Sequence, residues 1–532
     1  MRTAPPRSRR LLALLLLGLS ACTGPQAPAG SMQVSVEVDG VRQTVEVPAG
    51  STSAQALQAA GILLSPLDRV DPPGYTVLIS GSSVQVVRVL ERFEVETVTL
   101  PFERQTVRNE ALPQGETRLL QSGENGVQEI TFRIVEEEGV EVSRVQAQVV
   151  VVTEPRPEIV MIGAQAAYTP VPVEGTLAYV AGGNAWLIRS DSGNRRPLVV
   201  SGDLDSRVLQ LSPDGRWLLY SRRAGEDDGG INSLWVISTV DPDAEPFSLG
   251  VENVVHFADW SPTVPSTTLA YSTVEPRPAP PGWQANNDLN LVTFRATEHS
   301  GVVSQHRGVL PPNAGGQYGW WGSSFVWAGD AVHIAYTRPD SLGVIDLRQP
   351  EFAAWQDFVP YQARGDWAWL PGMAWGQDNR TLFVIRHGSP IGLEGPAASP
   401  IFDLVALNGP GAEPLTLAER AGMFAAPVSS PPRVLATGEI AYELGFLQAL
   451  SPLESETSGY ALAVIDRDGS NLHRLFPPAG EPGLNAQRTV WSPDGDRLAV
   501  VYRGDLWIVD RASGLGQRVT GDGQTTLCDW KP

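Results

Sequence analysis

From Gly175 to the C-terminus, short apolar runs alternate with polar turns, and one kind of run returns at a nearly regular spacing. The first copy is residues 177–179 (Leu-Ala-Tyr) and the second is residues 218–220 (Leu-Leu-Tyr). Further copies occupy residues 269–271, 334–336, 382–384, 440–442 and 498–500. A β-rich repeat of roughly 50 residues is typical of a β-propeller with one four-stranded blade per repeat, so we predict a mainly β fold containing such a ring.

Most copies are preceded by a tryptophan with a proline or aspartate close behind it, as at residues 260–262 and 491–493 (Trp-Ser-Pro). The first copy lacks this element, and the end of the chain supplies it as residues 530–532 (Trp-Lys-Pro). We therefore predict that the last strand, around residues 527–530, pairs with residues 176–180 and closes the ring, which removes exposed sheet edges. One blade per copy gives seven blades. The number would be six or eight blades if one of the less regular copies were wrongly assigned.

These features together resemble the TolB-like, WD-type propeller repeat of bacterial envelope proteins. On this resemblance, residues 172–532 form the propeller. Its clearest sequence marker is Ser-Pro-Asp-Gly, at residues 212–215 and 492–495. Proline suits the second position of a tight turn, aspartate bonds its own backbone and glycine accepts a positive φ. We interpret the phrase as a structural turn between the first two strands of a blade, not as a metal or acid–base site, and this interpretation covers Asp214, Gly215, Asp494 and Gly495.

The segment 32–90 begins with valines that alternate with polar residues, and a second alternating strand follows an Asp-Gly hairpin signal at residues 39–40. A short helix is predicted over residues 51–61, with Ser51 or Ser53 as its cap. Two more strands are predicted, over residues 75–80 and 83–90. A hairpin, one helix and further strands favour a β-grasp layout, and the segment resembles the ubiquitin-like domain of resuscitation-promoting-factor-type cell-wall proteins.

Residues 91–165 contain a Leu-Pro-x-Gly-Glu turn, a Gly-x-x-Gly loop and a closing Glu-Pro-x-x-x-Ile-Val-x-x-Gly. This segment strongly resembles the G-five domain, whose five glycines are here Gly115, Gly123, Gly126, Gly139 and Gly163. We expect each glycine at a turn with positive φ or where two backbones approach closely. The resemblance implies an elongated, β-rich module of surface adhesins and cell-wall enzymes, a family proposed to bind N-acetylglucosamine, and it supplies no catalytic residues.

The first 21 residues have the layout of a secretory signal peptide, with four arginines before a short apolar run at residues 11–19. The run ends in Leu-Ser-Ala-Cys, which closely resembles a bacterial lipobox. The resemblance implies lipidation of Cys22 and attachment to a membrane on the extracytoplasmic side of the bacterial envelope, with residues 22–31 as a tether. Cys528 is the only other cysteine, so no disulfide is expected.

The charge and motif content exclude several function classes. A net charge of −20 argues against a nucleic-acid partner, which requires a basic surface. The sequence has no Gly-x-Ser-x-Gly nucleophile motif, and its six histidines are scattered without metal-ligand spacing. We therefore expect no cofactor, no metal and no catalytic residue.

Insertions between the second and third strands of several blades would share one face of the ring with the blade-to-blade connections. Aromatic platforms with nearby acids suit sugar rings or partner proteins, and functional loops on a rigid scaffold are common. The alternative is that these aromatic residues pack blade against blade, as Trp260 and Trp491 are expected to do. The candidate ligand-face aromatics are Trp283, Tyr318, Trp320, Trp321, Trp367 and Trp369.

The sequence leads to one principal hypothesis: a non-catalytic, membrane-anchored envelope lipoprotein that binds cell-wall glycan or another envelope protein. Either the G-five segment or the loop-bearing face of the propeller would carry the binding site. One alternative is an enzyme acting on envelope polysaccharide at the propeller's central channel, which requires acids or histidines converging from several innermost strands. Another alternative is a purely structural spacer without a ligand.

Overall fold

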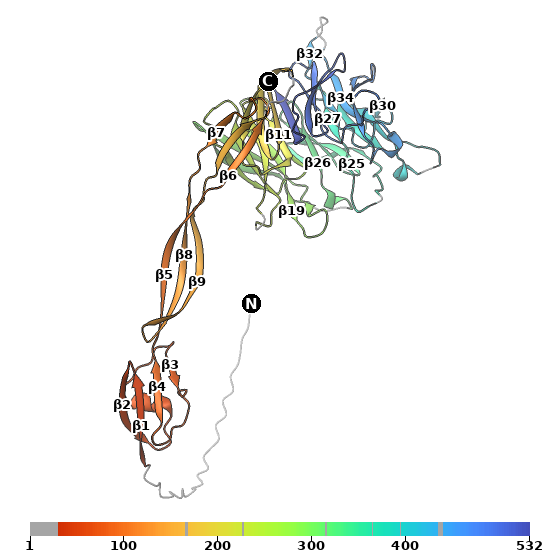
Figure 1. Cartoon of the computed structure of the whole chain (residues 1–532). Coiled ribbons are helices and arrows are strands. Elements are labelled where there is room, and N and C mark those ends of the chain that lie inside the picture. Colours follow the sequence, from red (N-terminus) through yellow and green to blue (C-terminus); the bar gives the residue numbers. More distant parts are fainter. Residues whose placement is uncertain are drawn as a thin grey trace, which may run out of the picture. The chain divides into compact units, whose positions relative to one another are not determined.

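The computed structural model describes residues 30–164, 169–225, 228–313, 317–363, 365–393, 395–434 and 440–532. The predicted signal peptide and Cys22 lie outside these residues. The chain divides into two compact units, one formed by residues up to 105 together with 121–158, and one by residues 106–120 together with 159–532 (Figure 1).

The first unit begins with a four-stranded sheet in the order β2-β1-β4-β3 and one helix, α1 (Ser53–Ala59). Its hairpin turn is at Asp39 and Gly40, which both have positive φ, as an Asp-Gly turn of this type requires. The helix is capped by Thr52 and not by Ser51 or Ser53, because the Thr52 side chain accepts the Gln55 N–H while the Gln55 side chain accepts the Thr52 N–H. The strands are β1 (Ser31–Val38), β2 (Val41–Pro48), β3 (Arg69–Asp71) and β4 (Ser83–Val87).

One predicted strand of this domain is wrong. Residues 75–80 form no strand and contribute only an isolated bridge between Thr52 and Val77. The fourth place in the sheet is taken by β3, which pairs with β4 in antiparallel fashion. The apolar side chains of residues 75–80 alternate, but Val77 and Ile79 are exposed, so no buried face holds that segment in a sheet.

A second sheet of the first unit has the order β5-β8-β9, with β5 (Val89–Leu100), β8 (Gly126–Glu137) and β9 (Val140–Thr153). Gly139 turns the chain between β8 and β9 with φ +79°. Gly126 is required for a different reason, because a Cβ there would lie 2.4 Å from the Thr153 carbonyl oxygen. Gly115 also has positive φ, and Gly163 also approaches another backbone closely. Gly123 does neither, because a Cβ there would meet the Phe102 ring.

The remaining strands of the G-five segment form a sheet in the order β6-β10-β7, with β6 (Arg104–Asn109), β10 (Glu158–Gly163) and β7 (Thr117–Gln121). Val107, Leu112, Ile159 and Met161 share a buried core with residues of the propeller, among them Leu177. The boundary between the two compact units therefore falls inside the G-five segment.

A buried ion pair reinforces this junction. Arg195 Nη1 lies 2.8 Å from Glu110 Oε2, and both side chains are almost completely buried. The same Glu110 oxygen accepts the backbone N–H of Gly521 at 2.9 Å, and Arg195 also donates to the Val519 carbonyl. Because breaking a buried pair leaves an uncompensated charge, this contact holds the end of the G-five segment to the propeller.

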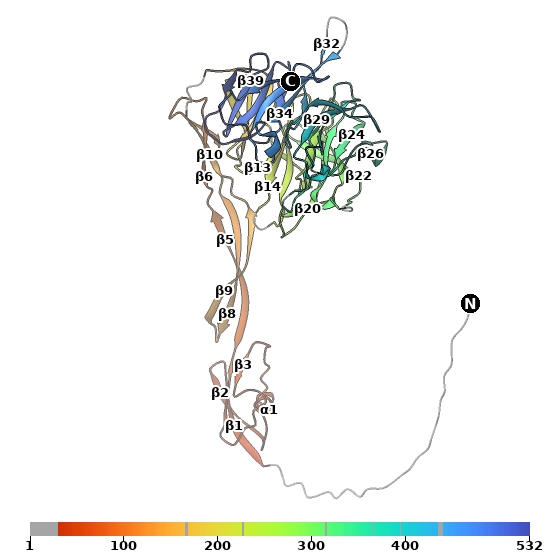
Figure 2. The ribbon, with the colours of Figure 1, turned by 90° about the vertical axis from the view of Figure 1, so that its right-hand side faces the viewer.

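The second unit also contains the propeller (Figures 1 and 2). Its described residues form seven blade sheets, of which six have four strands and one has three. Each sheet is antiparallel, and the first strands of successive sheets lie beside one another around a central channel. We number the sheets as blades 1 to 7. Blade 1 consists of β41 (Thr525–Lys531), β11 (Pro172–Ala181) and β12 (Asn184–Val199); blade 2 of β13 (Leu204–Leu211), β14 (Trp217–Arg223), β15 (Asn232–Ser238) and β16 (Phe247–Glu252); and blade 3 of β17 (Phe257–Trp260), β18 (Thr268–Ser272), β21 (Leu289–Ala296) and β22 (Gly301–Leu310). Blade 4 consists of β23 (Ser324–Trp327), β24 (His333–Thr337), β25 (Ser341–Asp346) and β26 (Gln349–Asp357), and blade 5 of β27 (Met373–Trp375), β28 (Leu382–His387), β29 (Phe402–Leu407) and β30 (Leu415–Ala418). Blade 6 consists of β31 (Val428–Ser429), β34 (Glu443–Ala449), β35 (Tyr460–Asp466) and β36 (His473–Phe476), and blade 7 of β37 (Val490–Trp491), β38 (Arg497–Tyr502), β39 (Asp505–Asp510) and β40 (Gly516–Arg518).

The C-terminal strand closes the ring as the sequence predicts. Strand β41 pairs with β11 in antiparallel register, with Leu177 opposite Trp530 and Val180 opposite Leu527. The first blade is thereby built from both ends of the propeller segment, and the edge of β11 that faces the channel is covered.

The two Ser-Pro-Asp-Gly phrases lie between the first and second strands of blades 2 and 7. In the first, Asp214 accepts the Ser212 hydroxyl at 2.6 Å and Gly215 has φ +65°. In the second, Gly495 has φ +72° and donates its N–H to the Ser492 carbonyl at 2.9 Å. Each aspartate is engaged within its own turn, which is the geometry of a structural element.

The second strand of blade 6 differs from the sequence prediction. Residues 440–442 do not form it, since Ile440 and Ala441 belong to a two-stranded sheet of β32 (Arg433–Val434) and β33 (Ile440–Ala441). Strand β34 takes the position, and its Leu444 and Phe446 are completely buried whereas Ile440 is 47% exposed. The loop to the third strand is therefore shorter than the sequence suggests, because residues 443–449 are strand.

Tryptophans on the first strands connect neighbouring blades by a repeated hydrogen bond. In each case the indole N–H donates to a backbone carbonyl on the first strand of the preceding blade. The pairs are Trp260 with Gln210 (2.9 Å), Trp375 with Val326 (3.1 Å) and Trp491 with Val428 (3.2 Å).

We expect Trp530→Ala to destabilise the propeller strongly. Trp530 is 2% exposed, and its indole N–H donates to the Glu174 carbonyl at 2.6 Å. Loss of such a side chain costs about 3–5 kcal/mol of unfolding free energy, which urea denaturation followed by circular dichroism would measure. Trp320→Ala is the control, because Trp320 is 36% exposed. Equal destabilisation by both substitutions would contradict the closing role of Trp530.

Candidate functional site

The connections between blades and the loops between second and third strands lie at the same end of every blade, because each sheet is antiparallel with its first strand innermost. We call this side of the ring the loop face. The candidate aromatic residues fall into two groups on it, one at blades 3 and 4 and one between blades 4, 5 and 6.

The first group surrounds Trp283, at the start of β20 (Trp283–Ala285), which pairs with β19 (Val274–Pro276). The Trp283 ring meets the His256 ring edge-on at 4.7 Å and the Trp321 ring at 6.4 Å. Asn287 donates to the Gly319 carbonyl at 2.7 Å and so fixes the short helix η1 (Gly319–Trp321). This group packs a hairpin against a connection, and Trp320 is its most exposed tryptophan, while Tyr318 is half-buried.

Beside the second group lies a cavity of about 480 Å³, which we call the Tyr361 pocket and which neither Trp367 nor Trp369 lines. Phe402 and Met423 are buried at its base, and the half-buried Tyr361 ring lies 5.4 Å from the Phe402 ring. On the other side, the loop around η3 (Pro452–Glu454) contributes two exposed carboxylates, Glu454 and Glu456. Tyr361 donates its hydroxyl to Glu456 at 3.2 Å, so an aromatic face and an acid lie together.

Buried polar contacts fix the loops around this pocket. His387, which is 3% exposed, places its two ring nitrogens 3.0 Å from the Val359 carbonyl and 2.7 Å from the Ser399 carbonyl. It thereby ties the connection that carries Tyr361 to the loop that carries Pro400. On the opposite side, the Ser455 hydroxyl accepts the Met423 N–H at 3.1 Å. The pocket is therefore preformed by the fold.

The structure corrects one candidate of this group. Trp369 is 4% exposed, and its indole N–H donates to the Met423 carbonyl at 3.0 Å, so it is a core residue behind the pocket. Trp367 is half-buried against Tyr361 at 6.1 Å. The residues that the sequence reasoning missed are Tyr361, Phe402, Glu454 and Glu456. The position of Tyr361 in a blade-to-blade connection was the only available signal.

The central channel is a second cavity, of about 1000 Å³, lined by the first strands of the blades. Among its described lining residues the only acid is Asp259 and the only histidine is His256, three residues apart at β17. Burial raises the pKa of Asp259 against the opposing effect of Arg488 and Lys531. Burial lowers the pKa of His256 to about 4, with a smaller contribution from Arg207, so its ring is neutral at pH 7. The described lining residues therefore bring together no acids or histidines from several strands.

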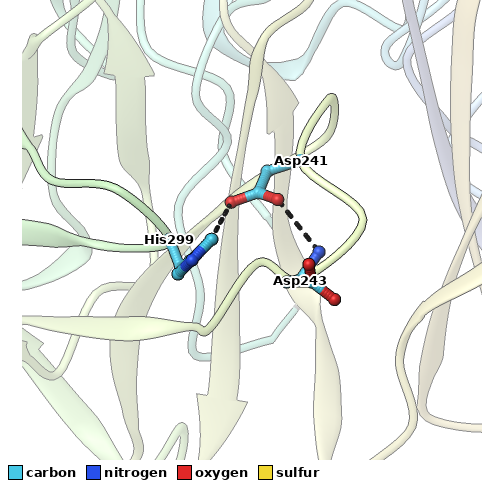
Figure 3. A group of neighbouring side chains, drawn as sticks. All are labelled: Asp241, Asp243 and His299. Atoms are coloured by element: carbon cyan, nitrogen blue, oxygen red, sulfur yellow. Dashed lines mark hydrogen bonds and ion pairs between the residues drawn. The ribbon is translucent and has the colours of Figure 1, made fainter.

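Asp241, Asp243 and His299 offer possible metal-ligand atoms within 4.8 Å of one another (Figure 3). His299 Nδ1 lies 3.0 Å from one Asp241 oxygen, and the other Asp241 oxygen accepts the Asp243 backbone N–H at 2.9 Å. The hydrogen bond with Asp241 raises the pKa of His299, and the same bond lowers the pKa of Asp241. Since the Glu245 N–H also donates to the His299 carbonyl, the contacts describe an ion pair between the outer loops of blades 2 and 3.

The rest of the described chain gives little support to covalent chemistry. Among the residues that the structure describes, no hydroxyl or thiol hydrogen bonds to a histidine ring, as an activated nucleophile would. The Cys528 thiol lies on β41, and burial raises its pKa to about 12, which disfavours the reactive thiolate. No helix within the described ranges is long and apolar enough to cross a membrane.

Comparison with known families identifies the two N-terminal modules. Residues 34–74 match the model described as the G5-linked ubiquitin-like domain, and residues 91–165 match the G5 domain. The chain combines a G5-linked ubiquitin-like domain, a G5 domain and a β-propeller. The propeller assignment rests on the sheet order and ring closure described above.

The chain is 26% identical over 187 residues to resuscitation-promoting factor RpfB of Mycolicibacterium smegmatis (strain ATCC 700084 / mc(2)155). The match covers 33% of this chain and 51% of the relative, so the chain spans about half the length of the curated relative it matches. Two solved structures resemble the propeller at low similarity. One is a Bacteroides fragilis NCTC 9343 protein described as a 6-phosphogluconolactonase, with 11% identity, a TM-score of 0.40, and coverage of 67% of this chain and 97% of that chain. The other is described as TolB of Agrobacterium tumefaciens, with 12% identity, a TM-score of 0.32, and coverage of 66% of this chain and 90% of that chain.

The Asp241–His299 pair generates a pH prediction. The pKa of His299 is higher in the folded protein than in the unfolded chain, where it is near 6.5. The ion pair therefore stabilises the fold fully at pH values below 6.5, and this stabilisation is lost as the pH rises through the pKa of the folded protein. We expect Asp241→Asn to lower the His299 pKa toward 6.5 in an NMR titration. Asp243→Asn is the comparison and should lower the pKa less, since the Asp243 carboxylate acts on His299 through its charge alone whereas Asp241 also hydrogen bonds the ring. Equal shifts in the two variants would contradict a specific pair.

Proposed function

We propose that this protein is a non-catalytic binding protein of the bacterial cell envelope, anchored through Cys22, that binds cell-wall glycan in the Tyr361 pocket. The observation that carries the proposal is the preformed pocket on the loop face, which joins an aromatic ring, an apolar base and two carboxylates. Such a combination suits a sugar, whose C–H face stacks on an aromatic ring while its hydroxyls donate to acids.

The N-terminal modules support an envelope location. The G5 and ubiquitin-like matches, together with the similarity to a resuscitation-promoting factor, associate this chain with proteins that work outside the cytoplasm. The lipobox-like sequence before Cys22 supports membrane attachment. The pair of acids in the pocket also fits hydroxyl groups better than an anionic ligand, because like charges repel.

The G5 domain itself is the alternative binding site. Deleting it is not a selective test, because part of it packs in a core shared with the propeller. Removal of residues 91–165 would delete Val107, Ile159 and Met161 from a core that they share with the propeller. It would also leave Arg195 buried without its partner Glu110. A deletion would therefore damage both sites at once, so single substitutions in the pocket are the informative experiment.

We expect Tyr361→Ala to weaken binding of uncharged glycan fragments built from N-acetylglucosamine by roughly tenfold in calorimetry, because the stacking face is lost. Tyr75→Ala is the matched control, since Tyr75 is an 84% exposed tyrosine in the ubiquitin-like domain. If both variants bind like the wild type, glycan binding lies outside the pocket, and the G5 domain becomes the site to test. If the wild type binds no fragment, the glycan proposal is wrong.

The anchor makes a separate prediction. In bacterial cells that process lipoproteins, Cys22→Ala should abolish incorporation of labelled fatty acid and move the protein from the membrane fraction to the soluble fraction. Cys528→Ala is the control, because that thiol lies within the fold on β41. Continued fatty-acid labelling of the Cys22→Ala protein would contradict lipidation at this residue.

A further inference from the structure

The walls of the central channel differ in charge. Three cationic side chains line it, Arg207, Arg488 and Lys531, whereas Asp259 is the only acid among its described lining residues. This excess of positive charge contrasts with the chain as a whole, which has 59 acidic and 39 basic residues. Lys531 is moreover the only lysine in the sequence, and ring closure brings it into the channel.

The cations lie on one side of the ring. Lys531 belongs to blade 1 and Arg207 to blade 2, and Arg488 leads into the first strand of blade 7. On the first strands of blades 4, 5 and 6, the channel is lined instead by uncharged and largely apolar side chains. These include Val326, Trp327, Met373, Trp375 and Val428.

The charges of Arg488 and Lys531 are only weakly neutralised by the protein. In the described part of the chain, Arg488 forms no ion pair, and its hydrogen bond to Gln210 is long at 3.4 Å. The Lys531 ammonium lies 4.0 Å from an oxygen of Asp529, whose other oxygen accepts the Leu211 N–H at 2.7 Å. Asp259 interacts with both cations, since Arg488 and Lys531 each lower its pKa against the larger opposing effect of burial.

A second observation concerns the opposite wall. The Trp327 side chain is 8% exposed, and its indole N–H has no hydrogen-bond partner among the described residues. The corresponding tryptophans of blades 3, 5 and 7 each donate to the preceding blade. A buried donor without a partner costs about 1–3 kcal/mol, and this nitrogen is closed off from the channel, so the Trp327 ring presents only apolar surface to a ligand there.

We propose that the central channel binds a small organic anion, with its carboxylate or phosphate between Arg488 and Lys531 and its apolar body against the wall formed by blades 4, 5 and 6. The cavity of about 1000 Å³ is large enough for such a molecule. This site is separate from the Tyr361 pocket and requires a different ligand, since its charge is positive and that of the pocket is negative. Neither proposal depends on the other.

The test uses 2-naphthoate and 2-naphthyl phosphate as probes, with the neutral 2-naphthalenemethanol for comparison, in calorimetry on the full mature chain. We expect both anions to bind and the alcohol to bind at least tenfold more weakly. The stronger anion identifies the preferred head group. Equal affinity for the alcohol would overturn the proposal, and so would the absence of anion binding.

Variants locate the site. Arg488→Gln and Lys531→Gln should each weaken anion binding by roughly tenfold, because each removes one charge-assisted contact. Asp259→Asn should leave affinity unchanged or strengthen it. Arg503→Gln is the control, an exposed arginine of blade 7 that is absent from the channel lining. Unchanged affinity in both channel variants would place the probe elsewhere and refute the site.

A measurement on the wild-type protein covers the case in which a variant fails to fold. Salt screens a charged contact more than an apolar one, so the affinity for 2-naphthoate should fall as NaCl is raised from 50 to 500 mM. The affinity for the alcohol should remain constant over the same range. Anion binding that does not respond to salt would contradict recognition by Arg488 and Lys531.

Discussion

The propeller depends on one pairing, that of the C-terminal strand β41 with β11. All other sheets are built from consecutive segments, whereas blade 1 needs residues that are about 350 positions apart in the sequence. Without β41, the inner edge of β11 would be open and Trp530, which is 2% exposed, would leave the core. The same strand presents Asp529 to blade 2, where it accepts the Leu211 N–H, so closure also aligns the next blade.

A closed ring gives the two candidate sites different characters. The Tyr361 pocket is built from loops, and its shape depends on local contacts such as the bridge of His387 between two backbone carbonyls. The channel is built from first strands, whose positions are set by the ring and by indole hydrogen bonds between blades. Loops can change without loss of the ring, whereas the channel lining is part of the scaffold itself, so a site in the channel is the more rigid of the two.

Much of this architecture was predictable from the sequence, because period and turn chemistry are local signals. The unmatched Trp-Lys-Pro at residues 530–532 predicted the closing strand, and the Asp-Gly pair at residues 39–40 predicted a hairpin, whose two turn residues have positive φ. The cap of α1 was missed among three consecutive hydroxyl residues, although Thr52 and Gln55 have the spacing of a capping box. The second strand of blade 6 was misplaced because two apolar runs adjoin there, and only burial shows that Leu444 belongs to the blade. Apart from the position of Tyr361 in a blade-to-blade connection, the Tyr361 pocket had no sequence signature, since its walls come from separate connections and loops of blades 4, 5 and 6 that the ring brings together.

The charge distribution in the channel follows from closure and is difficult to explain by stability alone. Closure brings the Lys531 ammonium into a channel that Arg207 and Arg488 also line, and like charges in a confined space repel. An uncharged residue at position 531 would avoid this cost, because the pairing of β41 with β11 uses only backbone groups. A ring held together for structural reasons would therefore not need this lysine at its last paired position. A ring that binds an anion would use it, since the ligand would bring its negative charge between Arg488 and Lys531.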